Sequence, residues 1–89
     1  MQVVIYAKEG CGICKSAKEK FEMMEIPFEV KDVAYHTTWH EGWKDDGSIE
    51  VLTEYSRRDQ HIPLILIDGK WHDYPSAMRF LKGATKQAS

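Results

Sequence analysis

The chain has 89 residues, enough for one domain and too few for two. Its 12 basic and 14 acidic side chains give a net charge of −2, and no basic stripe points to a nucleic-acid partner. No apolar run approaches the ~20 residues that cross a membrane, and Met1-Gln2 lacks the basic flank of a signal peptide, so we expect a soluble, cytoplasmic protein.

The first third of the chain predicts a strand, a helix and a second strand. Residues 3–7 are β-branched and aromatic, which indicates a buried strand. Gly10 breaks this pattern, and a helix with an apolar stripe follows. Pro27 ends the helix, and residues 28–33 alternate as a strand does. The stripe consists of Cys14, Ala17, Phe21 and Met24.

The middle of the chain is less regular. Residues 34–47 have no clean period and predict an irregular stretch with at most one short turn of helix. A second helix is expected from Ser48 to about Arg58. Its inward face is predicted to hold Ile49, Leu52 and Tyr55. Large aromatic side chains in a small domain favour the core or its edge, and here these are Trp39, Trp43 and Trp71.

The last third predicts a hairpin and a helix. Residues 62–67 form a nearly continuous apolar run, which favours a strand covered on both faces. Asp68-Gly69 is typical of a two-residue hairpin turn, after which residues 70–73 return as a strand. Pro75 suits the first turn of a third helix. The predicted inward face of this helix is Ala77, Phe80, Leu81 and Ala84.

This element order, β-α-β-α-β-β-α, predicts an α/β fold of the thioredoxin-like type. A strand, a crossover helix and a second strand form a parallel pair. The hairpin adds antiparallel strands, which gives a four-stranded mixed sheet flanked by helices. We assign the domain to residues 1–82 and a short C-terminal tail to residues 83–89.

The two cysteines lie where the first strand gives way to the first helix. Cys11 and Cys14 are one helical turn apart, so their sulfur atoms share a face. Unpaired N–H groups at the helix start, the helix dipole and the nearby Lys8 cation are expected to lower the pKa of Cys11. Cys14 lies on the apolar stripe and is expected to stay protonated and act as the resolving thiol.

Three other interpretations of the pair compete with this one. A zinc site needs further ligands, for which only His36 and His40 have suitable spacing. The cysteines are alternatively small core residues, as free cysteines often are. A third alternative is an iron–sulfur cluster held by Cys11 and an external thiol. A spacing of two residues at a strand-to-helix junction favours redox chemistry over all three.

Two segments of the chain resemble the glutaredoxin family. Residues 8–18, Lys-Glu-Gly-Cys-Gly-Ile-Cys-Lys-Ser-Ala-Lys, resemble its active-site segment, and residues 61–69 resemble its Thr-Val-Pro segment with the hairpin that follows. The resemblance covers residues 1–82 and is greatest to the small glutaredoxins of bacteriophages. It implies a cis peptide bond before Pro63, which would leave the main chain of Ile62 free to bind an extended thiol substrate.

The resemblance implies a monomeric dithiol–disulfide oxidoreductase with glutathione as co-substrate and no tightly bound cofactor or metal. It would reduce protein disulfides or glutathione mixed disulfides, with ribonucleotide reductase as one such partner. Cys11 would be the nucleophile and Cys14 the resolving thiol, and Lys8 would support the thiolate or bind a glutathione carboxylate. The implied glutathione contacts are Lys8, Ile13, Ile62, Pro63, Asp73 and Tyr74.

The chain departs from the family pattern at three places. Gly12-Ile13 replaces the usual Pro-Tyr between the cysteines. His61 replaces a threonine and either tunes the Cys11 thiolate or is a solvated surface residue. Residues 72–76, His-Asp-Tyr-Pro-Ser, replace the Gly-Gly-x-Asp that holds the γ-glutamyl end of glutathione. We therefore predict weaker glutathione binding, because the side chains of His72 and Asp73 occupy that place.

These departures leave two alternative functions open. One is a glutaredoxin-like protein that is reduced by a flavoenzyme of the thioredoxin-reductase type. The other is a module that binds a metal or an iron–sulfur cluster. Arg57 and Arg58 end the second helix, where they stabilise its dipole or bind glutathione.

Overall fold

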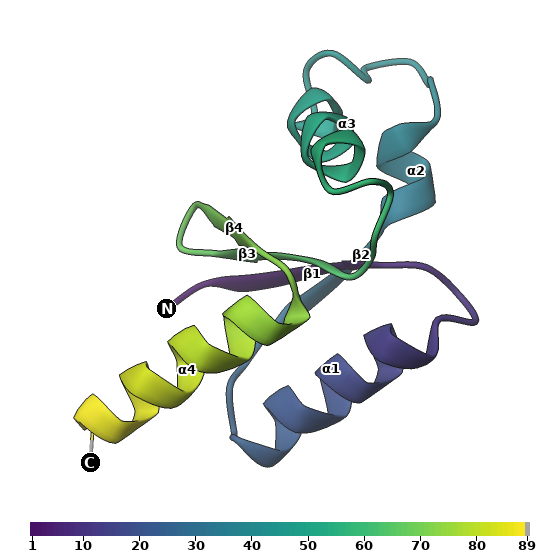
Figure 1. The fold of residues 1–89 in the computed structure, drawn as a ribbon. Coiled ribbons are helices and arrows are strands. Elements are labelled where there is room, and N and C mark those ends of the chain that lie inside the picture. The colour runs from purple at the N-terminus through teal and green to yellow at the C-terminus, as the bar shows by residue number, and fades with distance from the viewer. Residues whose placement is uncertain (89) are drawn as a thin grey trace.

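A four-stranded mixed sheet forms the centre of the molecule (Figure 1). The computed structural model describes residues 1–88, with the side chains of residues 1–83. The strands are β1 (Val3–Ala7), β2 (Glu29–Asp32), β3 (Leu64–Ile67) and β4 (Lys70–His72), in the order β2-β1-β3-β4. β1 pairs with β2 in parallel, and the other pairs are antiparallel. The predicted α/β fold of the thioredoxin-like type is confirmed.

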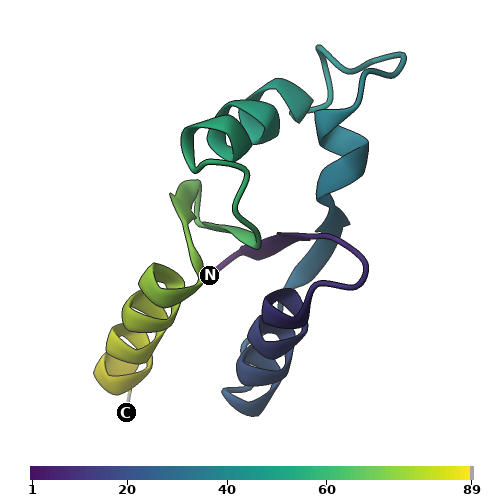
Figure 2. The same cartoon turned by 45° about the vertical axis from the view of Figure 1, so that its right-hand side comes forward.

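Helices cover both faces of this sheet. They are α1 (Gly12–Met23), α2 (Val33–Thr37), α3 (Ser48–Arg57) and α4 (Tyr74–Ala88). Figures 1 and 2 show α1 and α4 on one face of the sheet, with α2 and α3 on the other. α2 supplies the short helical turn expected in residues 34–47, although it begins at Val33, the predicted end of β2. Residues 83–88, assigned to a tail, continue α4.

Two hydrophobic cores explain why every residue of β1 is buried. Because side chains alternate along a strand, β1 contributes to both faces of the sheet. On one face Ile5 packs with Phe21 of α1 and Leu81 of α4. On the other face Tyr6 packs with Val51 of α3. The coverage on both faces that the apolar run of residues 62–67 predicted is found in β3, because Ile65 and Ile67 pack in the first core and Leu64 in the second.

The predicted inward face of α3 was right for Tyr55, which packs against the second core, and wrong for Ile49. The buried residues of this helix are Ser48, Val51 and Glu54, whereas Ile49 is 40% exposed. Glu54 is buried because its carboxylate accepts hydrogen bonds from Arg57 at 2.9 Å and from Arg58 at 3.3 Å. A charged side chain that is paired in this way can face the core, which a hydrophobic pattern does not reveal.

Two aromatic side chains also lie outside their predicted places. Trp39 is 77% exposed, in the turn region after α2. Phe80 is 43% exposed, because Ala77 and Leu81, four residues apart, fill the contact between α4 and the sheet. Ala84 lies outside the residues whose side chains are described. No helix within residues 1–88 is long and apolar enough to cross a membrane.

Candidate active site

Cys11 forms the N-cap of α1. Gly10 has a φ of 82°, which lets the chain turn after β1, and Cys11 follows in an extended conformation. Its Sγ accepts a hydrogen bond from the N–H of Cys14 at 3.2 Å, as a serine or aspartate oxygen does at other N-caps. Both thiols are free, and Cys14 is buried in the core between α1 and the sheet. The sequence placed both residues correctly.

The two thiols have opposite pKa shifts. Burial alone would raise the pKa of Cys11, but hydrogen bonds from Cys14 and Ile13 and the positive charge of Lys18 outweigh it and lower the pKa. Burial and the hydrogen bond to Cys11 raise the pKa of Cys14 to about 11. Cys11 is therefore the stronger acid of the pair and the more exposed sulfur.

The lysine whose charge lowers the pKa of Cys11 is Lys18. Sequence reasoning missed it and chose Lys8, whose exposed side chain precedes the helix. The signal was available, because Lys18 follows Cys11 by seven residues, or about two turns, and so lies on the same face. The contribution of Lys8 comes from its main chain, which lowers the pKa of Cys14. A role for the Lys8 ammonium group stays a prediction.

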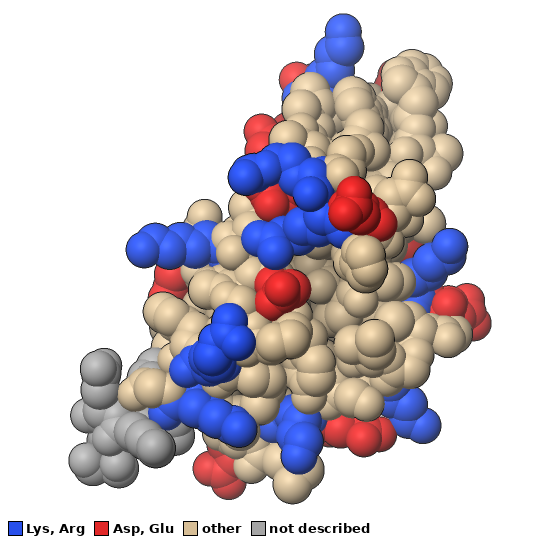
Figure 3. Space-filling model, in the orientation of Figure 1, with Lys and Arg blue, Asp and Glu red and all other residues tan. Residues whose placement is uncertain are grey.

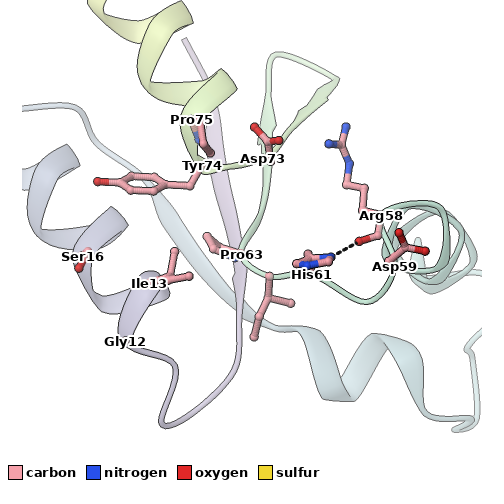
Figure 4. Close-up of a pocket in the computed structure, with 11 residues that line it drawn as sticks. Gly12, Ile13, Ser16, Arg58, Asp59, His61, Pro63, Asp73, Tyr74 and Pro75 are labelled. Atoms are coloured by element: carbon pink, nitrogen blue, oxygen red, sulfur yellow. Dashed lines mark hydrogen bonds between the residues drawn. The ribbon is translucent and has the colours of Figure 1, made fainter.

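A pocket of about 750 Å³ opens beside the cysteine motif (Figure 4). It brings the start of α1 together with two segments from much later in the chain, the one before β3 and the start of α4. Five predicted ligand contacts line it: Ile13, Ile62, Pro63, Asp73 and Tyr74. The other lining residues are Gly12, Ser16, Arg58, Asp59, His61 and Pro75. Of these, Ser16 was detectable as the next residue after Ile13 on the same face of α1.

The segment before β3 has the predicted conformation. The peptide bond between Ile62 and Pro63 is cis. β3 begins at Leu64, so Ile62 lies outside the ladder that joins β3 to β1. Its main chain is therefore positioned at the pocket wall rather than within the sheet.

The far end of the pocket is polar. Arg58 is held by Glu54 and by the main-chain oxygen of Trp71 at 3.4 Å. His61 Nδ1 lies 2.7 Å from the main-chain oxygen of Arg58, and its ring is exposed (Figure 4). On the face of the molecule seen in Figure 3, Lys and Arg side chains are interspersed with Asp and Glu. His61 is thus an exposed residue that also lines the pocket, and tuning of the Cys11 thiolate by its ring stays a prediction.

A side chain of the protein itself caps the N-terminus of α4. Asp73 Oδ1 accepts the N–H of Ser76 at 2.8 Å, so Asp73 is the N-cap and its carboxylate lies in the pocket wall. The prediction that His72 also brings its side chain to the ligand was wrong. Its Nδ1 lies 2.8 Å from Ser76 Oγ and its ring packs against Phe80, so it is turned into the protein.

The two histidines considered as zinc ligands belong to a separate network. His36 is buried, with Nδ1 2.8 Å from Ser48 Oγ, and Ser48 donates to Asp46. His40 Nε2 lies 2.6 Å from the Asp46 carboxylate. Within residues 1–88, no group of three His, Cys, Asp or Glu side chains is placed to hold a metal ion. The structure thus does not bring these histidines to the cysteines.

This network predicts a pH dependence of stability. Both ring nitrogens of His40 face acceptors, the Asp46 carboxylate and the main-chain oxygen of Thr38 at 3.1 Å, which suits the imidazolium form. The hydrogen bond to Asp46 raises the pKa of His40. A raised folded pKa adds stability that is complete below the ordinary value of ~6.5 and is lost as the pH rises through the folded pKa.

We therefore expect the melting temperature of the native chain to exceed that of His40→Gln most near pH 6. The difference should shrink as the pH rises, because both proteins then have a neutral side chain at position 40. Thermal melts at pH 6, 7 and 8 measure this, and Asp46→Asn in both backgrounds should remove the pH dependence of the difference. A difference that grows with pH would contradict the assignment.

Comparison with known proteins identifies the family of the chain. Residues 2–83 match the family model described as Glutaredoxin-like domain (DUF836). The chain belongs to this glutaredoxin-like family. A search of curated proteins found no match to the chain. Membership in the glutaredoxin-like family suggests a redox function, in agreement with the asymmetry of the two thiols.

Proposed function

We propose that this glutaredoxin-like protein is a cytoplasmic dithiol–disulfide oxidoreductase. It reduces disulfides of proteins or mixed disulfides with glutathione, and glutathione is its reductant. The observation that carries the proposal is the Cys11 sulfur at the N-cap of α1, where it accepts the Cys14 N–H and has the lower pKa of the two thiols. A nucleophilic thiolate beside a protonated resolving thiol is the arrangement that disulfide exchange requires.

The reaction proceeds by two exchanges. The Cys11 thiolate attacks one sulfur of the substrate disulfide, that S–S bond breaks, and the departing thiolate takes a proton from solvent. Cys14 then loses its proton and attacks Sγ of Cys11, which releases the second substrate thiol. The substrate gains two electrons and two protons, and Cys11–Cys14 becomes a disulfide. Two glutathione molecules restore the dithiol and leave as glutathione disulfide.

The pocket supports a place for the substrate. Its volume lies within the range of small-molecule sites, so a tripeptide fits it. The main chain of Ile62 would bond the cysteinyl part of glutathione, and Pro63, Ile13 and Tyr74 would contact its apolar surface. Lys8 would bind a carboxylate at the rim. A protein partner with an exposed disulfide, such as ribonucleotide reductase, would enter by the same opening.

A coupled assay tests the reductant. The oxidised protein is offered either glutathione with glutathione reductase or a thioredoxin-reductase-type flavoenzyme, and NADPH oxidation is followed with a disulfide substrate. We expect turnover with glutathione. Turnover with the flavoenzyme alone would favour the second candidate, for which the Asp73 carboxylate in the pocket wall is the specific reason. No turnover with either reductant would contradict the proposed activity.

The saturation of this activity by glutathione is expected to be weak. The Asp73 carboxylate faces the place where an anionic end of glutathione would lie, and a lost neutral main-chain contact costs about 0.5–1.5 kcal/mol. Asp73→Gly should therefore lower the apparent KM for glutathione several-fold, because it removes the charge while a glycine cap costs only a few tenths of a kcal/mol. Asp45→Gly, outside the pocket, is the matched control. An unchanged or higher KM in Asp73→Gly would refute this account.

A further inference from the structure

The start of α4 has few main-chain donors left for a ligand. The N-terminus of a helix binds anions because its first N–H groups are unpaired. In the first turn of α4, Pro75 has no N–H, and the N–H of Ser76 is donated to the Asp73 carboxylate. Two of the four N–H positions at the start of the helix, those of Pro75 and Ser76, are therefore closed to a ligand carboxylate. Such a carboxylate also meets the negative charge of Asp73, which lines the pocket.

One end of the pocket is apolar. In Figure 4 Ile13, Pro63 and Tyr74 lie together at one end, whereas Arg58, Asp59 and His61 lie at the other. Ile13 lies between the two cysteines in the chain and is 56% exposed. A large aliphatic side chain that is exposed next to a nucleophile gains from being covered when a substrate docks. The apolar end also lies nearest to the cysteine motif, because Ile13 belongs to it.

From these two observations we propose that the apolar end of the pocket, formed by Ile13, Pro63 and Tyr74, receives a large apolar side chain adjacent to the disulfide cysteine of a polypeptide substrate. An acidic side chain at that position is disfavoured by the charge of Asp73 and by the small number of donors left at the start of α4. The inference rests on the proposed function and names its substrate class. The exchange is the one given above: the peptide disulfide gains two electrons and two protons from Cys11 and Cys14.

Matched peptides test the inference on the full chain. Each hexapeptide carries one cysteine in a mixed disulfide with thionitrobenzoate, and only the residue after that cysteine varies: leucine, lysine or glutamate. The reduced protein is mixed with each peptide, and the release of the coloured thiolate gives kcat/KM. We expect the leucine peptide to react about tenfold faster than the glutamate peptide, the usual discrimination of a small apolar pocket. The lysine peptide should lie between them, because it lacks the repulsion by Asp73.

Two variants test which residues cause the preference for the leucine peptide over the glutamate peptide. Asp73→Asn keeps a capping side chain and removes the charge, so it should raise kcat/KM for the glutamate peptide about threefold relative to that for the leucine peptide. Tyr74→Ala should lower kcat/KM for the leucine peptide towards that of the lysine peptide. Tyr74 packs against the core, so the peptide series with the native chain stands as the test if this variant unfolds.

The outcomes separate the two proposals. Equal kcat/KM for the leucine and glutamate peptides, or a faster glutamate peptide, would overturn this inference and leave the proposed activity intact. Failure to release thionitrobenzoate from any of the peptides would overturn the proposed activity, and the inference with it. Both proposals are supported if the leucine peptide has the higher kcat/KM and if Asp73→Asn reduces this difference by raising kcat/KM for the glutamate peptide.

Discussion

Replacing Cys11 with serine is expected to abolish disulfide reduction, with a loss of about a thousandfold or more in kcat/KM. A hydroxyl group is not ionised at neutral pH and cannot form the mixed disulfide. The fold should survive, because serine is a preferred N-cap and its Oγ can accept the Cys14 N–H that the sulfur accepts now. The measurement is the coupled assay together with a thermal melt, and an unchanged melting temperature would separate lost chemistry from lost structure.

Cys14→Ser is the matched variant at the second thiol. It keeps the Cys11 nucleophile and removes only the resolving group, so reduction of protein disulfides should stop at the mixed disulfide. Reduction of a glutathione mixed disulfide should continue, because a second glutathione can take the place of Cys14. If Cys11→Ser retained dithiol activity, or if Cys14→Ser lost both activities while folded, the roles given to the two thiols would be wrong.

Alkylation of the reduced protein is expected to label Cys11 well before Cys14. The pKa of Cys14 is raised to about 11, whereas that of Cys11 is lowered from its ordinary value of 9.0. The opposite directions of the two shifts give Cys11 the larger thiolate fraction at pH 7. The more acidic thiol is intrinsically less reactive, but this offsets only about half of the advantage on a logarithmic scale, so Cys11 should be labelled faster.

The burial of Cys14, which is 1% exposed, should further increase the rate of Cys11 labelling relative to Cys14 labelling. Iodoacetamide at pH 6–7, stopped at short times and followed by peptide mass spectrometry, measures the label at each position. Lys18→Gln should lower the ratio of Cys11 to Cys14 labelling, since it removes the cation that lowers the pKa of Cys11. Lys15→Gln, an exposed lysine on the same helix, is the control. Equal labelling, or earlier labelling of Cys14, would exclude Cys11 as the nucleophile.

Features that depend on neighbouring residues were predictable from the sequence. The apolar run of residues 3–7 became β1, and Asp68-Gly69 forms the expected turn, with positive φ at both positions. The place of Cys11 at the start of α1 was predictable for the same reason, because strand end, turn and helix start lie within a few residues. Turn chemistry and hydrophobic period act over such short distances.

Features that depend on contacts between distant segments required the tertiary structure. Glu54 faces inward because its paired arginines lie one turn further along α3, and Arg58 is also bound to Trp71 of β4. The side chains of His72 and Asp73 point in different directions, because one hydrogen-bonds Ser76 Oγ and the other caps α4. Neither choice follows from hydrophobicity, since partners decide where a polar group is stable.

The pocket likewise combines segments that were predictable from the sequence with an arrangement that was not. The segments around it were recognisable one by one, as a cysteine motif, a proline before a strand and a helix start. Their arrangement around one cavity, with a carboxylate at the start of α4 and an apolar end beside the motif, arises only when β1 and β3 pair and bring α1 and α4 to one face of the sheet. The sequence therefore determined which residues are able to perform the chemistry. Long-range packing decided which of them share a cavity, because the free energy of that arrangement comes from burial between segments far apart in the chain.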